Sequence, residues 1–194
     1  MQIENLYNKF DHIHKIISSK EFLEMEASNG GIPFWISAYN PGQEVDVEKE
    51  MSNLEKRLAI EGINVLSVDL FELSMTIIQQ NIGIKELLKI EPKKKKDTFK
   101  RALQSTINIH ERLIPAIKEK VEVQDPKVLF VSGVGKVFPF IRSLNVLNNL
   151  QSSIKTIPTL LFFPGRYTGQ SLDLFGLLKD ENYYRASNID VYKL

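Results

Sequence analysis

The chain has 194 residues, 43% hydrophobic and 25% charged, and its 25 basic and 24 acidic residues give a formal net charge of +1. A chain of this length can bury a sizeable hydrophobic core without disulfide bonds or a structural metal. Its near-neutral net charge gives no overall electrostatic attraction to DNA or membranes. The absence of cysteine excludes disulfides, cysteine nucleophiles and cysteine-ligated metal centres, and three histidines leave little material for another metal site.

The N-terminus lacks the basic and apolar regions of a signal peptide, and no apolar stretch approaches the ~20 residues of a membrane helix. We therefore expect one soluble, cytoplasmic domain over residues 1–194, with no metal, cofactor or membrane contact.

The first third of the chain alternates amphipathic helices with short apolar runs. The stripe of the first predicted helix consists of Ile3, Leu6, Phe10, Ile13 and Ile17. This helix ends before the Asn29-Gly30-Gly31 turn. Strands are expected over residues 33–39, closed by Asn40-Pro41-Gly42, and over residues 64–69. A second helix between them ends at Gly62; its stripe is Val47, Met51, Leu54 and Leu58.

The middle of the chain is predicted to be helical. Residues 70–90 form the first helix, with Gly83 as its candidate break, and residues 97–121 form a long one that Pro115 kinks. The apolar stripe of the long helix comprises Phe99, Leu103, Ile107, His110, Ile114, Ile117 and Val121. Because His110 lies in that stripe, we expect it to be a hydrogen-bonded core histidine.

Two strongly apolar runs mark the last third. Residues 128–132 and 159–163 are predicted strands, a helix lies around residues 140–150, and Pro164-Gly165 ends the second strand. No element is assigned to residues 166–194. Short strands alternating with helices predict an α/β fold: a three-layer domain whose mainly parallel sheet of four to five strands carries helices on both faces, like a degenerate nucleotide-binding fold.

A glycine-rich turn with a lysine follows the third strand, at Ser132-Gly133-Val134-Gly135-Lys136. A complete phosphate-binding loop would require glycine at position 130 and serine or threonine at 137, whereas the chain has Phe130 and Val137. The ligand for magnesium is therefore missing. A tight strand-to-helix turn is the favoured interpretation; nucleotide binding or phosphoryl transfer by the Gly133–Lys136 loop is the alternative.

The carboxyl ends of parallel strands meet at one edge of a sheet, where ligands bind in such folds. The loops expected there would bring together one carboxylate and several cations in a possible phosphate or carboxylate pocket: Asn40, Asp69, Gly133, Gly135, Lys136, Arg142 and Arg166. The competing interpretation, which we favour, is that these loops close the fold and offer polar contacts to a partner.

Other chemistry finds little support in the sequence. His12 and His14 are two apart on a helix and point in different directions, so they cannot share a metal. No histidine accompanies a candidate serine nucleophile, so no catalytic residue is nominated. Lys93–Lys96, with Lys100 and Arg101, form a basic cluster that we interpret as a solvated surface loop rather than a DNA contact.

Several spaced blocks in the C-terminal half resemble the BrxB family of bacteriophage exclusion (BREX) defence systems. The blocks are Gly133-Val134-Gly135, Phe138-Pro139-Phe140-Ile141-Arg142-Ser143, Asn145-Val146-Leu147-Asn148-Asn149-Leu150, Phe163-Pro164-Gly165 with Tyr167 and Gly169, Leu172, Leu174-Phe175-Gly176-Leu177, and Asn182-Tyr183-Tyr184-Arg185-Ala186. The length and the opening helix also fit. A histidine often follows the Arg-Ser pair in this family; here the residue is Leu144.

The resemblance implies a role in a system that methylates host DNA at adenine and blocks replication of unmodified phage. It implies no catalytic activity, and it implies partners: PglZ, which resembles alkaline-phosphatase-type enzymes, as the direct one, beside a large ATPase and an adenine methyltransferase. We therefore expect a non-catalytic adaptor. Its candidate interface combines tyrosine and arginine, the types enriched in interface hot spots: Arg166, Tyr167, Tyr183, Tyr184 and Arg185.

Overall fold

A parallel β-sheet forms the centre of the computed structural model, which describes residues 5–26, 33–180 and 185–194. Four strands run in the order β2 (Val65–Asp69), β3 (Val128–Ser132), β4 (Thr159–Tyr167) and β1 (Phe34–Tyr39), and each neighbouring pair is parallel. A short strand, β7 (Ser187–Asn188), extends the sheet beyond β1. The predicted α/β class and mainly parallel sheet are confirmed.

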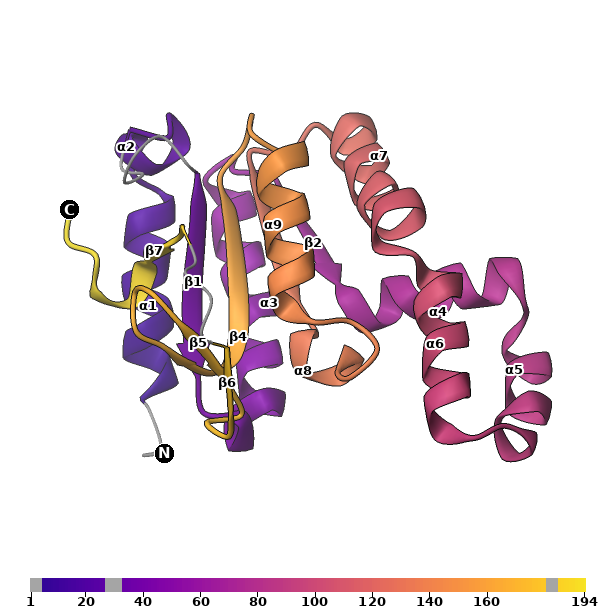
Figure 1. Cartoon of the computed structure of the whole chain (residues 1–194). Coiled ribbons are helices and arrows are strands. Elements are labelled where there is room, and N and C mark those ends of the chain that lie inside the picture. The colour runs from indigo at the N-terminus through magenta and orange to yellow at the C-terminus, as the bar shows by residue number, and fades with distance from the viewer. Residues whose placement is uncertain (1–4, 27–32, 181–184) are drawn as a thin grey trace.

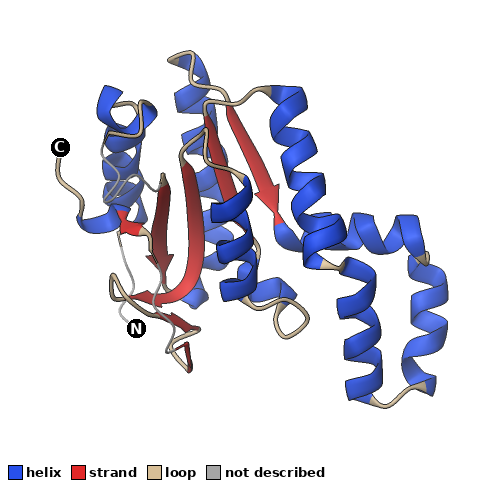
Figure 2. Cartoon of the chain, turned by 45° about the horizontal axis from the view of Figure 1, so that its top comes forward, coloured by secondary structure: helices blue, strands red, loops and turns tan. Residues whose placement is uncertain are grey.

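Helices cover both faces of the sheet (Figures 1 and 2). On one face α1 (Leu6–Ile17) and α3 (Glu44–Ile60) cover Trp35, Phe130 and Phe162. The short helix α2 (Lys20–Leu23) packs beside them. The other face, with Phe34 and Val131, lies under helices α4 (Leu70–Asn81), α7 (Ile114–Gln124), α8 (Val134–Val137) and α9 (Ser143–Ser153). Alternate residues of each strand serve opposite cores because successive side chains in a strand point to opposite faces.

A helical arm stands out from the sheet on the right of Figure 1. It continues from α4 through α5 (Ile84–Ile90) and a 3-10 turn, η3 (Glu91–Lys93), into α6 (Lys96–Ile107). The predicted break at Gly83 is confirmed: this residue has a φ of 83°, which favours glycine. The basic tract Lys93–Lys96 is exposed at the tip of the arm, as expected for a solvated segment.

The long helix predicted over residues 97–121 is two helices joined by a π-helical turn, η4 (Ile109–Leu113). The break lies at Asn108, whose φ is 31°, and Pro115 stands in the first turn of α7 instead of kinking a continuous helix. The wider turn rotates the following side chains relative to the 3.6-residue stripe. The prediction of His110 as a core histidine is therefore wrong, and its side chain is exposed.

The prediction that Pro164-Gly165 ends the fourth strand is also wrong. The strand β4 continues through both residues and bends into an antiparallel unit with β5 (Leu172–Leu174) and β6 (Leu178–Asp180). After β7 a 3-10 turn, η5 (Ile189–Val191), lies against α1 and β1. None of the helices in the described ranges is long and apolar enough to cross a bilayer.

Candidate functional site at the carboxyl edge of the sheet

The carboxyl edge of the sheet holds an ion cluster centred on Lys136. The Nζ atom of Lys136, in α8, lies 3.0 Å from Oδ2 of Asp69, at the end of β2, and also contacts Oε1 of Glu48, in α3. Burial works to lower the pKa of Lys136, but the hydrogen bonds and charges of the two carboxylates outweigh it and raise this pKa. The sequence thus brings together Asp69 and Lys136 as expected, and Glu48 was missed because α3 approaches from the opposite face of the sheet.

Asp69 also begins helix α4. Its Oδ1 atom accepts hydrogen bonds from the backbone N–H groups of Phe71, at 2.7 Å, and Glu72, at 3.1 Å. Such a cap satisfies amides that a helix start otherwise leaves unpaired. One carboxylate therefore has two structural roles here, since one oxygen caps the helix and the other holds the lysine.

The two glycines of the Gly133–Lys136 turn make room for the protein's own side chains. A Cβ atom at Gly133 would lie 2.4 Å from Oδ1 of Asp69. A Cβ atom at Gly135 would lie 2.8 Å from Cε1 of Phe175 and 3.0 Å from Cγ of Pro164. Phe175 comes from the turn between β5 and β6 and lies over α8. The space that a phosphate would occupy above such a turn is thus taken up by the C-terminal hairpin.

The start of α3 makes this edge more acidic. Tyr39, the last residue of β1, donates a 2.6 Å hydrogen bond from its hydroxyl to Oε2 of Glu44. Burial, followed by the Glu44 carboxylate, raises the pKa of Tyr39. Asn40 is occupied at the same place, because its side chain accepts a hydrogen bond from the N–H of Gly42 in a 3-10 turn, η2 (Pro41–Gln43). Two carboxylates paired with Lys136, with Glu44 bound to Tyr39 at the same edge, do not favour an anion.

The structure does not bring Arg142 or Arg166 to Lys136. Arg142 precedes α9 and lines a separate hollow with His110 and Asn108. Arg166 is exposed on the extension of β4, in register with Asp173 of β5. The expected pocket thus divides into an ion cluster at Asp69, Gly133 and Lys136, a glycine covered by Phe175, and two arginines that do not join the ion cluster.

The candidate interface residues have different surroundings. Tyr167 was expected at the interface, but its side chain does not project from the surface. It is 8% exposed, and its hydroxyl donates a 2.7 Å hydrogen bond to the carbonyl oxygen of Ala186. Arg185 is exposed. Tyr183 and Tyr184 lie outside the described residues.

Sequence reasoning missed a partly buried polar cluster that holds the C-terminal segment. Asp190 accepts hydrogen bonds from the hydroxyl of Ser37 at 2.8 Å and from the N–H of Ala38 at 3.0 Å, and Nζ of Lys9 lies 3.1 Å from its carboxylate. Burial raises the pKa of Asp190, although these partners act to lower it. No short-range pattern could reveal the cluster, because it joins α1, β1 and η5.

The first two histidines take part in contacts between elements. Nε2 of His12 lies 3.0 Å from the carbonyl oxygen of Ile189, and Nε2 of His14 lies 3.0 Å from Oε1 of Glu61. The described parts of the chain contain no group of three histidine or carboxylate side chains able to hold a metal ion.

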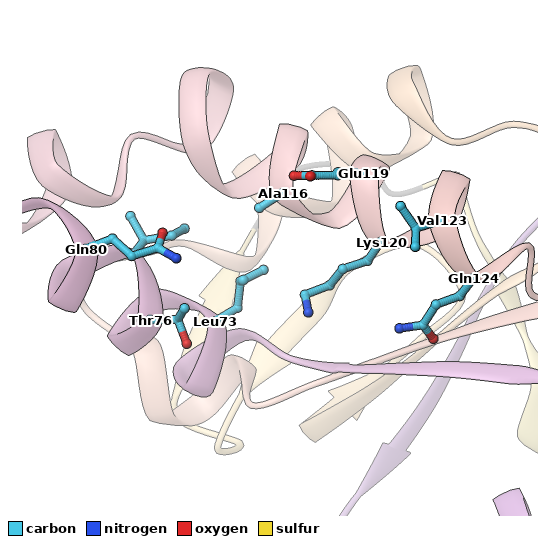
Figure 3. A pocket seen from close by; sticks show the side chains of 9 residues that line it. Leu73, Thr76, Gln80, Ala116, Glu119, Lys120, Val123 and Gln124 are labelled. Atoms are coloured by element: carbon cyan, nitrogen blue, oxygen red, sulfur yellow. The ribbon is translucent and has the colours of Figure 1, made fainter.

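A shallow groove lies between α4 and α7, with a volume of about 400 Å³ (Figure 3). Leu73 of α4 and Ala116 of α7 form part of its apolar floor, and Lys120 extends from α7 towards α4. The groove shares no residue with the ion cluster.

The fold and its carboxyl edge define the class of protein: an α/β layer structure whose own hairpin and carboxylates fill the edge that binds ligands in comparable sheets. The family model described as "BREX protein BrxB" matches residues 66–189. The chain belongs to the BrxB family, whose members are components of BREX antiviral defence.

Two curated relatives agree with this assignment over nearly the whole chain. A BREX protein BrxB of Bacillus cereus (strain H3081.97) is 33% identical over 189 residues, which covers 95% of this chain and 97% of the relative. A BREX protein BrxB of Escherichia coli O9:H4 (strain HS) is 24% identical over 178 residues, covering 92% of this chain and 88% of the relative. No solved structure matches the chain significantly.

Proposed function

We propose that the chain is a non-catalytic binding subunit of its BREX system. Its direct partner is the PglZ-like component, and through that contact it supports host DNA methylation and phage exclusion in the cytoplasm. The ATPase and the methyltransferase join the same assembly.

The single observation that carries this proposal is the closed state of the Gly133–Lys136 turn. Gly135 lies under Phe175, and Lys136 is held by Asp69 and Glu48. A phosphoryl-transfer site needs a cation and backbone amides directed at the phosphates. Here the cation is neutralised by carboxylates, and a side chain of the same protein covers the turn.

The hairpin that covers this turn offers a surface for a partner. Leu177, in the turn between β5 and β6, is 83% exposed, and Leu178, the first residue of β6, is 42% exposed. The exposed Arg166 of β4 belongs to the same antiparallel unit, in register with Asp173 of β5. Exposed apolar side chains beside arginine are typical of protein interfaces. The β5–β6 hairpin is therefore the surface we assign to the PglZ-like partner, with Arg185 as a second candidate.

Co-purification tests the proposal. A tagged copy, expressed with the complete defence system, should bring down the PglZ-like component. The change Leu177→Asp should weaken this association at least tenfold. The matched control is Ile60→Asp, because Ile60 is 86% exposed at the far end of α3 and the same change there should leave binding intact.

Two results would contradict this proposal. If the wild-type chain retains no BREX component, the adaptor role is wrong. If ATP or GTP with magnesium raises the melting temperature, the enzyme alternative gains support, since a ligand at 100 times its Kd stabilises a protein by about 2.7 kcal/mol.

A further inference from the structure

A hollow of about 440 Å³ lies where the end of α6, the π-helical turn and the segment before α9 meet. Its polar lining includes Ser105, Asn108, His110, Arg142 and Asn145. We propose that this hollow binds a carboxylate, namely an aspartate or glutamate side chain of the partner protein. This inference rests on the proposed adaptor function and identifies the group that the adaptor recognises.

Arg142 supplies the cation. It is exposed, and its side chain has no hydrogen-bond or ion-pair partner among the residues that the structure describes. The nearby Arg112 is occupied, because its guanidinium donates a 2.6 Å hydrogen bond to the carbonyl oxygen of Thr106. Arg142 is thus the guanidinium at this hollow that remains available. Its planar fork matches a carboxylate with two parallel hydrogen bonds.

Glu111, which follows His110 in the sequence, is held by Asn108. Oε2 of Glu111 accepts a 2.7 Å hydrogen bond from the amide of Asn108, whose own oxygen accepts from the N–H of Glu111 at 3.1 Å. This pairing fixes the π-helical turn, and His110 follows Asn108 by two residues at the rim. His110 also has no partner in the described part of the chain. Arg142 and His110 therefore offer donors that the protein does not use itself.

The rest of the lining explains why we assign a carboxylate from a protein. Buried Ile107 and Ile141, with half-buried Phe140, make part of the wall apolar. One arginine beside one histidine, with no lysine in the lining, matches a singly charged group better than a polyphosphate. An acidic side chain flanked by apolar residues fits both parts of the hollow.

Amide NMR shifts of the full chain test the pocket directly. N-acetyl-aspartate amide, whose side chain carries its single carboxylate, should at millimolar concentration shift the Ser143, Asn145 and His110 resonances. N-acetyl-asparagine amide, which carries no carboxylate, should shift them at least fivefold less. Arg142→Ala should abolish the response. Arg101→Ala should preserve it, because Arg101 is exposed on α6 outside the hollow. Equal responses to the two probes, no response, or a stronger response to inorganic phosphate overturns the carboxylate assignment.

Affinity for the PglZ-like component then separates the two proposals. We expect Arg142→Ala to raise the Kd at least tenfold and Arg142→Lys to raise it less, because lysine keeps the charge but loses the fork. Arg101→Ala should change the Kd by less than twofold. If the wild-type chain and Arg142→Ala bind the PglZ-like component equally well, the pocket proposal is wrong but the adaptor function stands. A wild-type chain that binds no component, with the NMR response intact, overturns the adaptor function instead.

Discussion

Asp69 and Gly133 leave each other no room for one more carbon atom: a Cβ at Gly133 would lie 2.4 Å from Oδ1 of Asp69. That oxygen caps α4, and the φ of Gly133 is 76°, a region costly to other residues. We therefore predict that Gly133→Ala destabilises the protein by about 2–4 kcal/mol, the sum of the strained backbone and a displaced cap. Urea unfolding measures this loss.

A double-mutant cycle identifies the cause. The combination of Gly133→Ala with Asp69→Ala should cost less than the sum of the two single changes, because the second removes the atoms that the new methyl group meets. Additive costs would show that the carboxylate is not what requires glycine at position 133.

The second prediction concerns the covering of the turn by Phe175. Gly135→Ala should destabilise the chain by about 1–3 kcal/mol, because its methyl group would meet the ring of Phe175 at 2.8 Å and Pro164 at 3.0 Å. With Phe175→Ala in the background, the same change should cost much less. Thermal unfolding of the four proteins decides this, and an unchanged cost would mean that Pro164 alone limits the space.

The fold was predictable where local patterns and long-range pairing agree. The strands around Trp35, Phe130 and Phe162 are mostly apolar on both faces, as a sheet covered by two helical layers requires. The π-helical turn was not predictable, because Asn108 adopts a backbone conformation that no periodicity reveals. A proline such as Pro164 usually marks the end of a strand. Here β4 continues, because Pro164 pairs with Tyr39 of β1 and the next three residues pair with β5.

The candidate site was predictable in the same limited way. The rule that ligand loops follow parallel strands brought Asp69 and Lys136 together correctly. It could not reveal Glu48, which arrives from α3, or Phe175, which arrives from the unassigned C-terminal region. Those two contacts determine that the turn is closed, so the sequence left open the very question that the structure answers.

A third prediction follows from the buried Asp190. Because burial raises its pKa above the usual 3.8, the folded chain binds this proton more readily than the unfolded chain. The free energy of unfolding should therefore rise, relative to Asp190→Asn, as the pH falls through the raised pKa, and the gain is complete below 3.8. Chemical unfolding of both proteins between pH 7 and pH 3 measures the difference.

Asp11 provides a control of opposite sign. Hydrogen bonds from Lys15 and Arg57 lower the pKa of this partly exposed carboxyl. Relative to Asp11→Asn, the wild-type chain should therefore lose stability as the pH falls through that lowered pKa. Parallel trends for the two variants would contradict the assignment of a buried, proton-binding Asp190.

The fourth prediction tests whether Lys136 has any chemical role. Lys136→Ala should leave phage exclusion and partner binding intact, because its ammonium only joins Asp69 and Glu48. The cost in stability should stay below about 1 kcal/mol, as for other partly exposed ion pairs. Plaque counts on cells carrying the system provide the measurement. Loss of protection by a stable variant that still binds its partner would instead assign catalysis to this turn.

The last prediction separates structure from recognition at two adjacent residues of β4. Tyr167 is buried and hydrogen-bonded to the Ala186 carbonyl, whereas Arg166 is exposed, in register with Asp173 of the hairpin. Tyr167→Phe should cost about 1 kcal/mol for the lost hydrogen bond, and Tyr167→Ala about 3–5 kcal/mol for the emptied space. As long as they fold, the two Tyr167 variants should bind the PglZ-like component with unchanged affinity.

Arg166→Ala should behave in the opposite way. The free energy of unfolding of this variant should differ from that of the wild-type chain by less than about 0.5 kcal/mol, as is usual for substitutions of exposed residues. Affinity for the PglZ-like component should fall by about 1–3 kcal/mol if the hairpin is the interface. Urea unfolding and calorimetric titration of the same three variants measure both quantities. Normal binding by Arg166→Ala and Leu177→Asp together would move the interface away from the hairpin, to the exposed faces of α3, α6 and α7.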